Sequence, residues 1–255
     1  MKIGNEILGL IPARYASTRF PGKPLAQLGG KTVIERVYSR VSEVLDNVAV
    51  ATDDERIADA VRAFGGRAVM TSSAHRSGTD RCSEAYRNLS SDARVVINIQ
   101  GDEPFIDPSQ IRALAACFDN PATDIATLAR HFDKSAGFEA LFDPNLVKVV
   151  FGNDGRALYF SRSIIPYVRN HEWKEWLDHA DFHTHVGIYA YRAEVLQRLA
   201  QLPQSSLEKA ESLEQLRWLQ NGFNIRVAVT DCPTIGIDTP ADLAAAEEYL
   251  KTLQK

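Results

Sequence analysis

The sequence predicts an α/β fold: a mostly parallel (mixed) sheet covered by helices on both faces. Short apolar runs alternate with amphipathic helical patterns through the first half of the chain, which is typical of parallel strands joined by crossover helices. The second half instead contains a hairpin signal and a weaker helical rhythm, which indicates a smaller β-rich insertion. A chain of 255 residues is long enough to bury one substantial core.

The first half begins with an apolar strand at Ile7–Ile11. A helix follows Thr32, because Thr32 and Glu35 form a capping box and the valines behind them keep helical spacing. The remaining elements expected in this half are strand Val48–Thr52, helix Asp54–Phe64 stopped by Gly65-Gly66, strand Ala68–Thr71, helix Thr79–Leu89, strand Val95–Gln100 and a helix that starts at Asp107-Pro108.

The second half is expected to contain a hairpin at Asn153-Asp154-Gly155. Because no internal repeat or low-complexity linker separates the two halves, we predict a single domain over residues 1–255. The elements expected here are strands Leu146–Phe151, Arg156–Phe160, His183–Tyr191 and Ile225–Val229, helix Leu207–Asn221 closed by Gly222, and a last helix capped by Thr239-Pro240.

The composition argues against several classes of protein. A net charge of −4 opposes general binding to nucleic acid, which is expected of basic domains. The sequence has neither a charged leader followed by an apolar segment nor a run of about 18 apolar residues, so we expect no export and no membrane span. Cys82, Cys117 and Cys232 are odd in number and widely spaced, which indicates free thiols in a reducing cytoplasm.

The loop after the first strand carries the strongest functional signal. It contains the cations Arg14, Arg19 and Lys23 and the hydroxyl residues Ser17 and Thr18. Guanidinium groups offer forked donors, an ammonium offers a point charge, and hydroxyl and backbone N–H groups fill the gaps around a polyphosphate. The alternative interpretation is a solvated basic turn.

Two other loops, residues 71–81 and 100–105, follow predicted strands. They should open at the same edge of the sheet, where ligands bind in open parallel sheets. Residues 71–81, TSSAHRSGTDR, lead into a helix whose N-terminus could receive a base edge or a phosphate. The alternatives here are a plain N-cap by Thr79 and a packing or surface role for His75.

Two aspartates form a candidate metal site. Asp102 follows the most apolar predicted strand directly behind Gly101, and Asp238 lies between an apolar segment and a helix start in the sequence GIDTP. Mg²⁺ is usually held by one or two carboxylates together with phosphate oxygens and water. The alternatives are a turn residue for Asp102 and a helix cap for Asp238.

Other patterns are weaker. His183 and His185 share one face of a predicted strand, but no third zinc ligand lies nearby in the sequence. The absence of G-x-G-x-x-G disfavours a nicotinamide-dependent oxidoreductase, and the G-x-S-x-G, H-E-x-x-H and P-loop motifs are also missing. Residues 171–183 crowd Trp173, Trp176 and three histidines into a segment of weak periodicity, which fits a mobile lid or a dimer arm.

Seven ordered blocks give the chain a specific resemblance. IPARYASTRFPGKPL, HRSGTDR, INIQGDEPFI, FSRSIIPY, HVGIYAYR, ESLEQLRWLQNG and GIDTPADL occur in the order typical of the bacterial 3-deoxy-manno-octulosonate (Kdo) cytidylyltransferase family, over residues 10–247. The resemblance implies a nucleotidyltransferase-like fold. It also implies an activity that uses CTP and Mg²⁺ to convert Kdo into CMP-Kdo and pyrophosphate, on the route to lipopolysaccharide. Separately, the hairpin, aromatic residues and strand within residues 155–200 predict a homodimer interface.

The resemblance also implies roles for individual residues and for parts of the chain. Residues 1–120 would bind the nucleotide, 121–235 would bind the sugar and form the dimer, and 236–255 would return a helix to the core. The triphosphate would be gripped by Arg14, Ser17, Thr18, Arg19 and Lys23, of which Arg19 and Lys23 act in catalysis. The nucleoside side would face Arg76, Ser77, Thr79 and Arg81. Asp102 and Asp238 would hold the metal. The sugar acid would contact Gln100, Arg162, His185, Tyr189 and Glu211.

One departure from the family pattern is visible. Family members commonly have the sequence S-R-x-P-I-P where this chain has Ser161-Arg162-Ser163-Ile164-Ile165-Pro166. The sequence therefore does not define the shape of this loop, although Arg162 is retained. No dedicated general base is evident, and His185 is the fallback. Alternatives that remain are a cytidylyltransferase for an 8-amino Kdo analogue or a sialic acid, and a nucleotide-binding module without catalysis.

Overall fold

The computed structural model describes residues 2–253 and divides the chain into two compact units. Unit 1 contains the chain up to Arg112, then Ala190–Ala200, and then the segment from Pro233 onward. Unit 2 contains Ala113–Tyr189 and Gln201–Cys232. The prediction of one domain with three functional parts stays a prediction, and each unit is described by itself.

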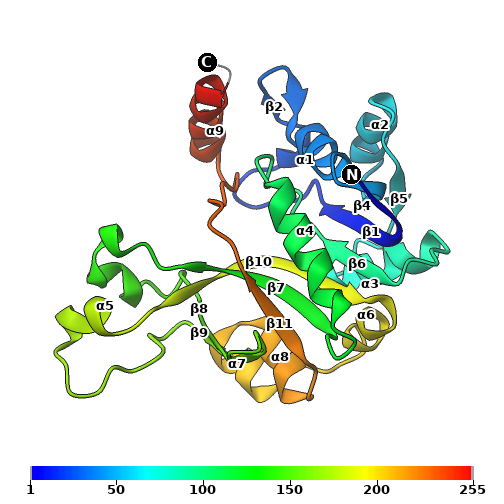
Figure 1. The fold of residues 1–255 in the computed structure, drawn as a ribbon. Helices are drawn as coiled ribbons and strands as arrows, with labels where there is room; N and C mark the ends of the chain where they lie inside the picture. Colours follow the sequence, from blue (N-terminus) through cyan, green and yellow to red (C-terminus); the bar gives the residue numbers. More distant parts are fainter. Residues whose placement is uncertain (1, 254–255) are drawn as a thin grey trace. The chain divides into compact units, whose positions relative to one another are not determined.

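A parallel sheet forms the centre of unit 1. β1 pairs in parallel with β4 and with β6, and β4 pairs in parallel with β5 (Figure 1). The middle of β1 is fully buried at Leu8, Leu10 and Ile11, as expected of an apolar run in a parallel sheet. The strands span β1 Ile3–Ala13, β4 Leu45–Thr52, β5 Ala68–Met70 and β6 Val95–Asn98, and a small antiparallel pair comprises β2 Gln27–Leu28 and β3 Lys31–Thr32.

The helices of unit 1 begin at polar caps. The Thr32 side chain accepts the Glu35 N–H, and the Asp54 side chain accepts the Arg56 N–H, so both predicted starts are confirmed. Ser77, rather than Thr79, caps the third helix. The helices are α1 Val33–Ser42, α2 Glu55–Ala63, α3 Gly78–Asn88, α6 Ala193–Leu199 and α9 Pro240–Leu253, while α4 Pro108–Ala116 runs across the boundary between the units.

The last segment of unit 1 packs back onto its core. Ile237 and Ala246 are fully buried in one hydrophobic cluster with Leu28 and Val33. The backbone N–H of Ile237 donates to the carbonyl of Asp102 at 2.9 Å. This hydrogen bond brings the segment before α9 against the loop after β6.

Unit 2 contains a mixed sheet. β7 lies between β11 and β10, and its pairing with β11 is parallel, whereas β8 pairs antiparallel with both β9 and β10. The predicted hairpin is confirmed, with a positive φ at Gly155 in its turn. The strands span β7 Ile125–His131, β8 Lys148–Phe151, β9 Ala157–Ser161, β10 His183–Arg192 and β11 Ile225–Val229, and the end of β10 belongs to unit 1.

The single helix predicted at Leu207–Asn221 is wrong. The chain forms α7 (Ser206–Glu211) and α8 (Glu214–Gln220), because Ser212 adopts a left-handed conformation with φ of +52°. A capping box, in which Ser205 and Glu208 bond each other's backbone N–H groups, begins α7. The break leaves the carbonyl groups of Glu211 and Ser212 available to other partners.

Residues 171–183, whose sequence is only weakly periodic, contain a helical segment that packs one face into a hydrophobic cluster. A 3₁₀ turn at Trp173–Glu175 leads into α5 (Trp176–His179), and Trp176 and Leu177 are buried with Phe138, Leu141 and neighbouring aromatic residues. Further 3₁₀ turns occur at Lys23–Leu25, Cys117–Asp119, Lys134–Ala136 and Phe138–Phe142. Among residues 2–253, no helix has the length and apolar character needed to cross a bilayer.

Candidate active site

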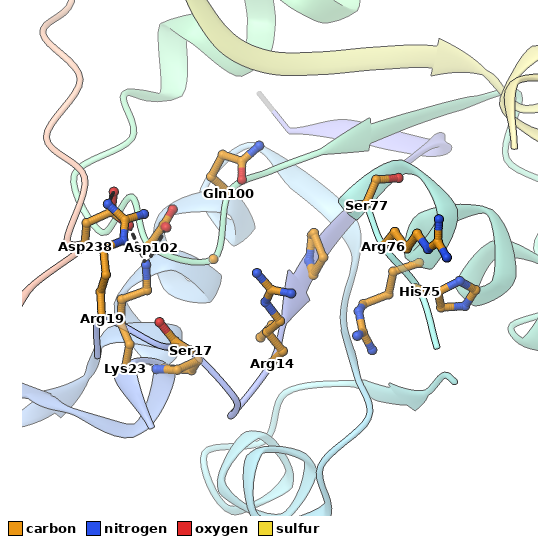
Figure 2. A pocket seen from close by; sticks show the side chains of 16 residues that line it. Arg14, Ser17, Arg19, Lys23, His75, Arg76, Ser77, Gln100, Asp102 and Asp238 are labelled. Atoms are coloured by element: carbon orange, nitrogen blue, oxygen red, sulfur yellow. Dashed lines mark hydrogen bonds and ion pairs between the residues drawn. The ribbon is translucent and has the colours of Figure 1, made fainter. Parts of the chain in front are cut away.

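A cavity of about 280 Å³ opens in unit 1 at the carboxyl ends of β1 and β6 and beside the N-terminus of α3. All three loops singled out in the sequence contribute to its wall, as does the segment before α9 (Figure 2). The predicted site residues that line it are Arg14, Ser17, Arg19, Lys23, Arg76, Ser77, Arg81, Gln100, Asp102 and Asp238.

Lys23 joins the two aspartates at one end of the cavity. Its Nζ atom lies 2.6 Å from Asp102 Oδ2 and 3.1 Å from Asp238 Oδ1, and Arg19 Nη1 lies 3.2 Å from Asp238 Oδ2. Figure 2 shows the Lys23 side chain pointing between the two carboxylates. The two predicted metal ligands, far apart in the sequence, therefore converge on a single cationic point.

The contacts of Lys23 with both aspartates indicate whether these residues could hold a divalent ion. Lys23 stands in for a cation, and the atoms around it are carboxylate oxygens, the donors that Mg²⁺ prefers. Asp238 is not used as a helix cap, because the Thr239 hydroxyl accepts the Asp242 N–H at 3.2 Å at the start of α9 and Asp242 accepts the Thr239 N–H at 2.8 Å. The donor set fits a Mg²⁺ site.

Two guanidinium groups in the cavity are uncommitted. Arg14 and Arg76 line it from the β1 loop and the α3 loop, both are exposed, and neither has an ion-pair partner within residues 2–253. Figure 2 shows Arg14 between the Lys23 end of the cavity and the loop of Arg76. A cation without an internal partner is available to an anionic ligand.

Arg81 and Ser77 line the cavity but are also engaged in the protein. Arg81 is buried, with Nη1 2.7 Å from Thr71 Oγ1 and Nη2 3.3 Å from Asp53 Oδ2. Ser77 Oγ accepts the Asp80 N–H at 3.1 Å and so caps α3. Both residues hold the wall of the cavity in place.

Gly101 sets how closely the β6 loop approaches β1. A Cβ atom at this position would lie 2.7 Å from the carbonyl oxygen of Pro12, a distance at which backbone must move. Only glycine at position 101 therefore lets the loop after β6 come this close to β1, and this approach places the neighbouring Asp102.

Glu103 adds a titrating group next to Asp102. Burial, helped by the negative charge of Asp102, raises the pKa of Glu103 to about 7. Near neutral pH this carboxyl group is therefore partly protonated, which limits the negative charge beside the aspartate pair.

Two predicted nucleotide contacts do not line the cavity. Thr18 is exposed on the β1 loop, and Thr79 is buried with its hydroxyl group 3.4 Å from Tyr191 Oη. His75, treated from the sequence as a packing or surface residue, does line the cavity and bonds Glu84. The signal in the sequence that could have marked His75 is its place within the loop of residues 71–81, in the HRSGTDR block.

The other predicted sugar contacts belong to unit 2, where Arg162 and Glu211 form a network. Glu211 accepts the Arg162 N–H at 2.6 Å and the Ser161 hydroxyl at 2.8 Å. The Arg162 guanidinium donates to the carbonyls of Pro144, Glu211 and Ser212, so it uses three of its five N–H donors on neutral acceptors. Within the described residues 2–253, no carboxylate pairs with its guanidinium group.

Lys148 supports this network and was missed from the sequence. Its side chain is fully buried, and Nζ donates to the carbonyls of Arg162 at 2.7 Å and Asp143 at 3.1 Å. Burial lowers the pKa of Lys148, against the opposing charges of Asp143 and Glu211. Its position in an apolar strand gave no sign of a polar role.

His185 and Tyr189 lie on β10. Nε2 of His185 is 2.9 Å from Thr127 Oγ1, and the ring packs against those of Phe160 and Tyr189. Burial lowers the pKa of His185 to about 3. A histidine with so low a pKa stays neutral and is a weak base, which argues against its use as the fallback base.

Comparison with known proteins agrees with the chemistry of the cavity. The profile of the family described as cytidylyltransferase matches residues 8–226. A curated relative in Bacteroides thetaiotaomicron, named 3-deoxy-manno-octulosonate cytidylyltransferase, is 60% identical over 246 residues, which cover 96% of this chain and 98% of that protein. A relative of the same name in Phocaeicola vulgatus is 61% identical over 246 residues, with the same two shares.

Solved structures give the same result for the fold. A CMP:2-keto-3-deoxy-manno-octonic acid synthetase complexed with CTP is 45% identical, has a TM-score of 0.88, and matches over 97% of this chain and 99% of its own. A cytidylyltransferase from Leptospira borgpetersenii matches with a TM-score of 0.60 over 98% of this chain and 95% of its own. At 15% identity, this second likeness extends to the fold alone.

Proposed function

This chain belongs to the 3-deoxy-manno-octulosonate cytidylyltransferase family, and we propose that it transfers CMP from CTP to Kdo, giving CMP-Kdo and pyrophosphate. The observation that carries the proposal is the cavity of unit 1, which five cationic side chains line and in which Arg19 and Lys23 contact a pair of converging carboxylates. The product would serve lipopolysaccharide biosynthesis, as the family resemblance implies.

The phosphates of CTP are assigned to the cations of the cavity. Arg14 and Arg76 are free to bind phosphate oxygens because they have no ion-pair partner within residues 2–253. A cation about 4 Å from such an oxygen gains roughly 4 kcal/mol at an effective dielectric constant near 20, before desolvation is counted. Ser77 and Arg81 hold the α3 loop against the nucleoside side.

The proposed reaction is an in-line displacement. The C2 hydroxyl of Kdo attacks the α-phosphorus of CTP and its oxygen forms the new P–O bond, while its proton is released to water. Pyrophosphate takes the electrons of the P–O bond that breaks. Arg19 and Lys23 are assigned to the charge that develops on the departing pyrophosphate. Catalysis by these groups is positioning and charge stabilisation rather than covalent chemistry.

Mg²⁺ is the proposed cofactor, held by Asp102 and Asp238. Their convergence on one ammonium group supports this assignment, since a divalent ion uses the same oxygen donors. When bound, the ion polarises the α-phosphate and lowers the pKa of the attacking hydroxyl.

Unit 2 contains four of the residues assigned to the sugar acid, Arg162, His185, Tyr189 and Glu211. Gln100, the fifth predicted contact, lines the cavity of unit 1. Arg162 is suited to the Kdo carboxylate because its guanidinium carries a full charge and, among residues 2–253, bonds only backbone carbonyls. His185, neutral by its low pKa, serves as a hydrogen-bonding and packing group.

A pyrophosphate-release assay with a panel of sugar acids tests the function. The purified chain is incubated with CTP, Mg²⁺ and, in turn, Kdo, an 8-amino Kdo analogue and a sialic acid, with no partner protein. We expect the highest kcat/KM with Kdo. Release with a sialic acid alone would contradict the substrate, and no release with any sugar would favour a binding module without catalysis.

We further propose a homodimer in the cytoplasm. Exposed apolar side chains at Leu158 and Tyr167, in the segment 155–200, support a protein interface there. Within residues 2–253, no disulfide bond joins Cys82, Cys117 and Cys232, which supports a reducing compartment.

A further inference from the structure

Outside the cavity, three potential metal ligands come together in unit 2. The ligand atoms of His171, Glu175 and His179 all lie within 4.8 Å of one another. None of these residues takes part in the function proposed above, and the sequence pattern had drawn attention to a different pair, His183 and His185. We propose that His171, Glu175 and His179 form a Zn²⁺-binding site, with two imidazole nitrogens and one carboxylate oxygen as ligands.

The spacing of the three residues explains their convergence. Glu175 ends the 3₁₀ turn and His179 ends α5, so the two lie four residues apart on one helical face. His171 lies four residues before Glu175, and its Nδ1 atom is 3.8 Å from Glu175 Oε2. The rings of His171 and His179 stack with their centroids 3.5 Å apart.

The backbone that carries the three ligands is held by the core of unit 2. Trp176 and Leu177, between Glu175 and His179, are buried in the aromatic core of unit 2. The indole Nε1 of Trp176 donates to the carbonyl of His171 at 3.2 Å, which ties the loop before the helix to the helix itself. The buried pair Trp176 and Leu177 thus holds the backbone in the core, while the three ligands face solvent.

The donor groups are free to coordinate. Within residues 2–253, neither imidazole has a hydrogen-bond partner, and the His171–Glu175 separation is too long for a hydrogen bond. His171 keeps 36% of its side-chain surface exposed, and Glu175 and His179 are exposed, so an ion can reach all three.

The chemistry selects zinc over magnesium. Two imidazole nitrogens suit Zn²⁺ and its neighbours in the transition series, whereas Mg²⁺ takes oxygen ligands. Zinc bonds of about 2.0–2.1 Å hold tetrahedral ligand atoms roughly 3.4 Å apart. A small closing movement of exposed side chains therefore completes three positions of a tetrahedron, and water takes the fourth. The ion would clamp residue 171 to residue 179.

The first test is zinc binding by the whole chain. Protein treated with a chelator is titrated with ZnCl₂ by calorimetry in saturating Mg²⁺, which occupies oxygen-donor sites, and without CTP or sugar. One equivalent is expected to bind. Because losing an outer-shell partner alone costs about 10–100-fold in affinity, His171→Ala and His179→Ala should each weaken binding by at least about 10-fold.

Glu172→Gln is the matched control, since Glu172 is an exposed acid beside the trio but outside it. It should leave zinc affinity unchanged. Equal affinity in wild type and in the His171→Ala/His179→Ala double variant would overturn the site, as would a wild type that takes up no zinc.

X-ray absorption of the zinc-loaded wild type gives a test that needs no variant. Two imidazole ligands and light-atom donors are expected in the first shell. A shell of oxygen alone, or one containing sulfur from a cysteine, would overturn the assignment. Neither measurement depends on turnover, so failure of this site and failure of the proposed function are separate results.

Discussion

Lys23 occupies the position between Asp102 and Asp238 that a cofactor ion would share. Its ammonium group is mostly buried and contacts both carboxylates, so it neutralises the pair and points their oxygens at one place. The sequence allowed both aspartates to be predicted as a pair, because each follows an apolar segment at a loop. It gave no means of predicting the bridge by Lys23, which depends on contacts between distant parts of the chain.

Removing either carboxylate should abolish most of the activity. We expect Asp102→Asn and Asp238→Asn each to lower kcat by at least about 100-fold, as does loss of one central electrostatic group in other enzymes. The measurement is pyrophosphate release at saturating CTP and Mg²⁺. Glu248→Gln, on the exposed face of α9, is the control and should keep normal turnover. Near-normal kcat in either aspartate variant would remove it from the metal site.

Lys23→Ala should lower kcat more than it weakens CTP binding. A group that stabilises departing pyrophosphate acts in the transition state, and its loss should cost about 100-fold in kcat. Steady-state kinetics separate kcat from KM, and Lys31→Ala is the control, because Lys31 pairs with Glu35 outside the cavity. An effect on KM alone would argue that Lys23 only binds the nucleotide.

His185 should make stability depend on pH. Its pKa is about 3 in the folded chain, compared with 6.5 as the ordinary value, so between these values the unfolded chain binds one more proton. Stability should therefore fall as pH falls from 6.5 towards 3, by about 1.4 kcal/mol per pH unit relative to a His185→Gln variant. Urea unfolding of both proteins across this range measures the difference. Parallel pH curves would show that His185 titrates normally.

At the scale of elements, the strands predicted from apolar runs are confirmed, whereas features set by tertiary contacts were missed. β7 was not predicted because its buried Thr127 and the charged end at Arg130 interrupt the apolar pattern, although Thr127 bonds the carbonyl of Ile188. The break between α7 and α8 has a similar cause. Arg162 donates to the carbonyls of Glu211 and Ser212, which a continuous helix would use internally.

The close approach of β6 to β1 predicts a contrast between two glycines. Gly101→Ala forces backbone apart at Pro12 and shifts Asp102, and a misplacement of about 1 Å can cost roughly 100-fold in rate. Gly236→Ala, near the other aspartate, meets no atom within 4 Å and should stay close to wild type in kcat/KM. Both variants are assayed for pyrophosphate release. Equal losses, or none, would show that the approach at Gly101 does not position the site.

At the scale of the whole molecule, the sequence predicted the fold class and the loops that gather in unit 1. It did not predict the boundaries of the two units, because these depend on which segments pack together: residues 190–200 pack within unit 1 although the residues on either side belong to unit 2. Ile237, just before α9, and Ala246, within α9, are buried in one cluster with Leu28 and Val33, and the role predicted for residues 236–255 stays a prediction.

The proposed dimer can be tested at an exposed leucine. Leu158 is 63% exposed on β9, within the segment assigned to the interface, and Leu253 is 60% exposed on α9 outside it. Leu158→Asp should convert a particle of twice the 28.3 kDa chain mass into a monomer, while Leu253→Asp should leave it intact. Light scattering after gel filtration measures both masses. A wild type that runs as a monomer would refute the dimer itself.

The hydrogen bond from Ile237 to Asp102 has a consequence for protein synthesis. A ribosome delivers Asp102 and the basic loop long before it delivers Asp238, so a nascent chain holds only one of the two carboxylates assigned to the proposed metal site. The two loops can join only once the segment before α9 has left the exit tunnel. A polypeptide stalled before this point in translation should therefore show no CTP turnover.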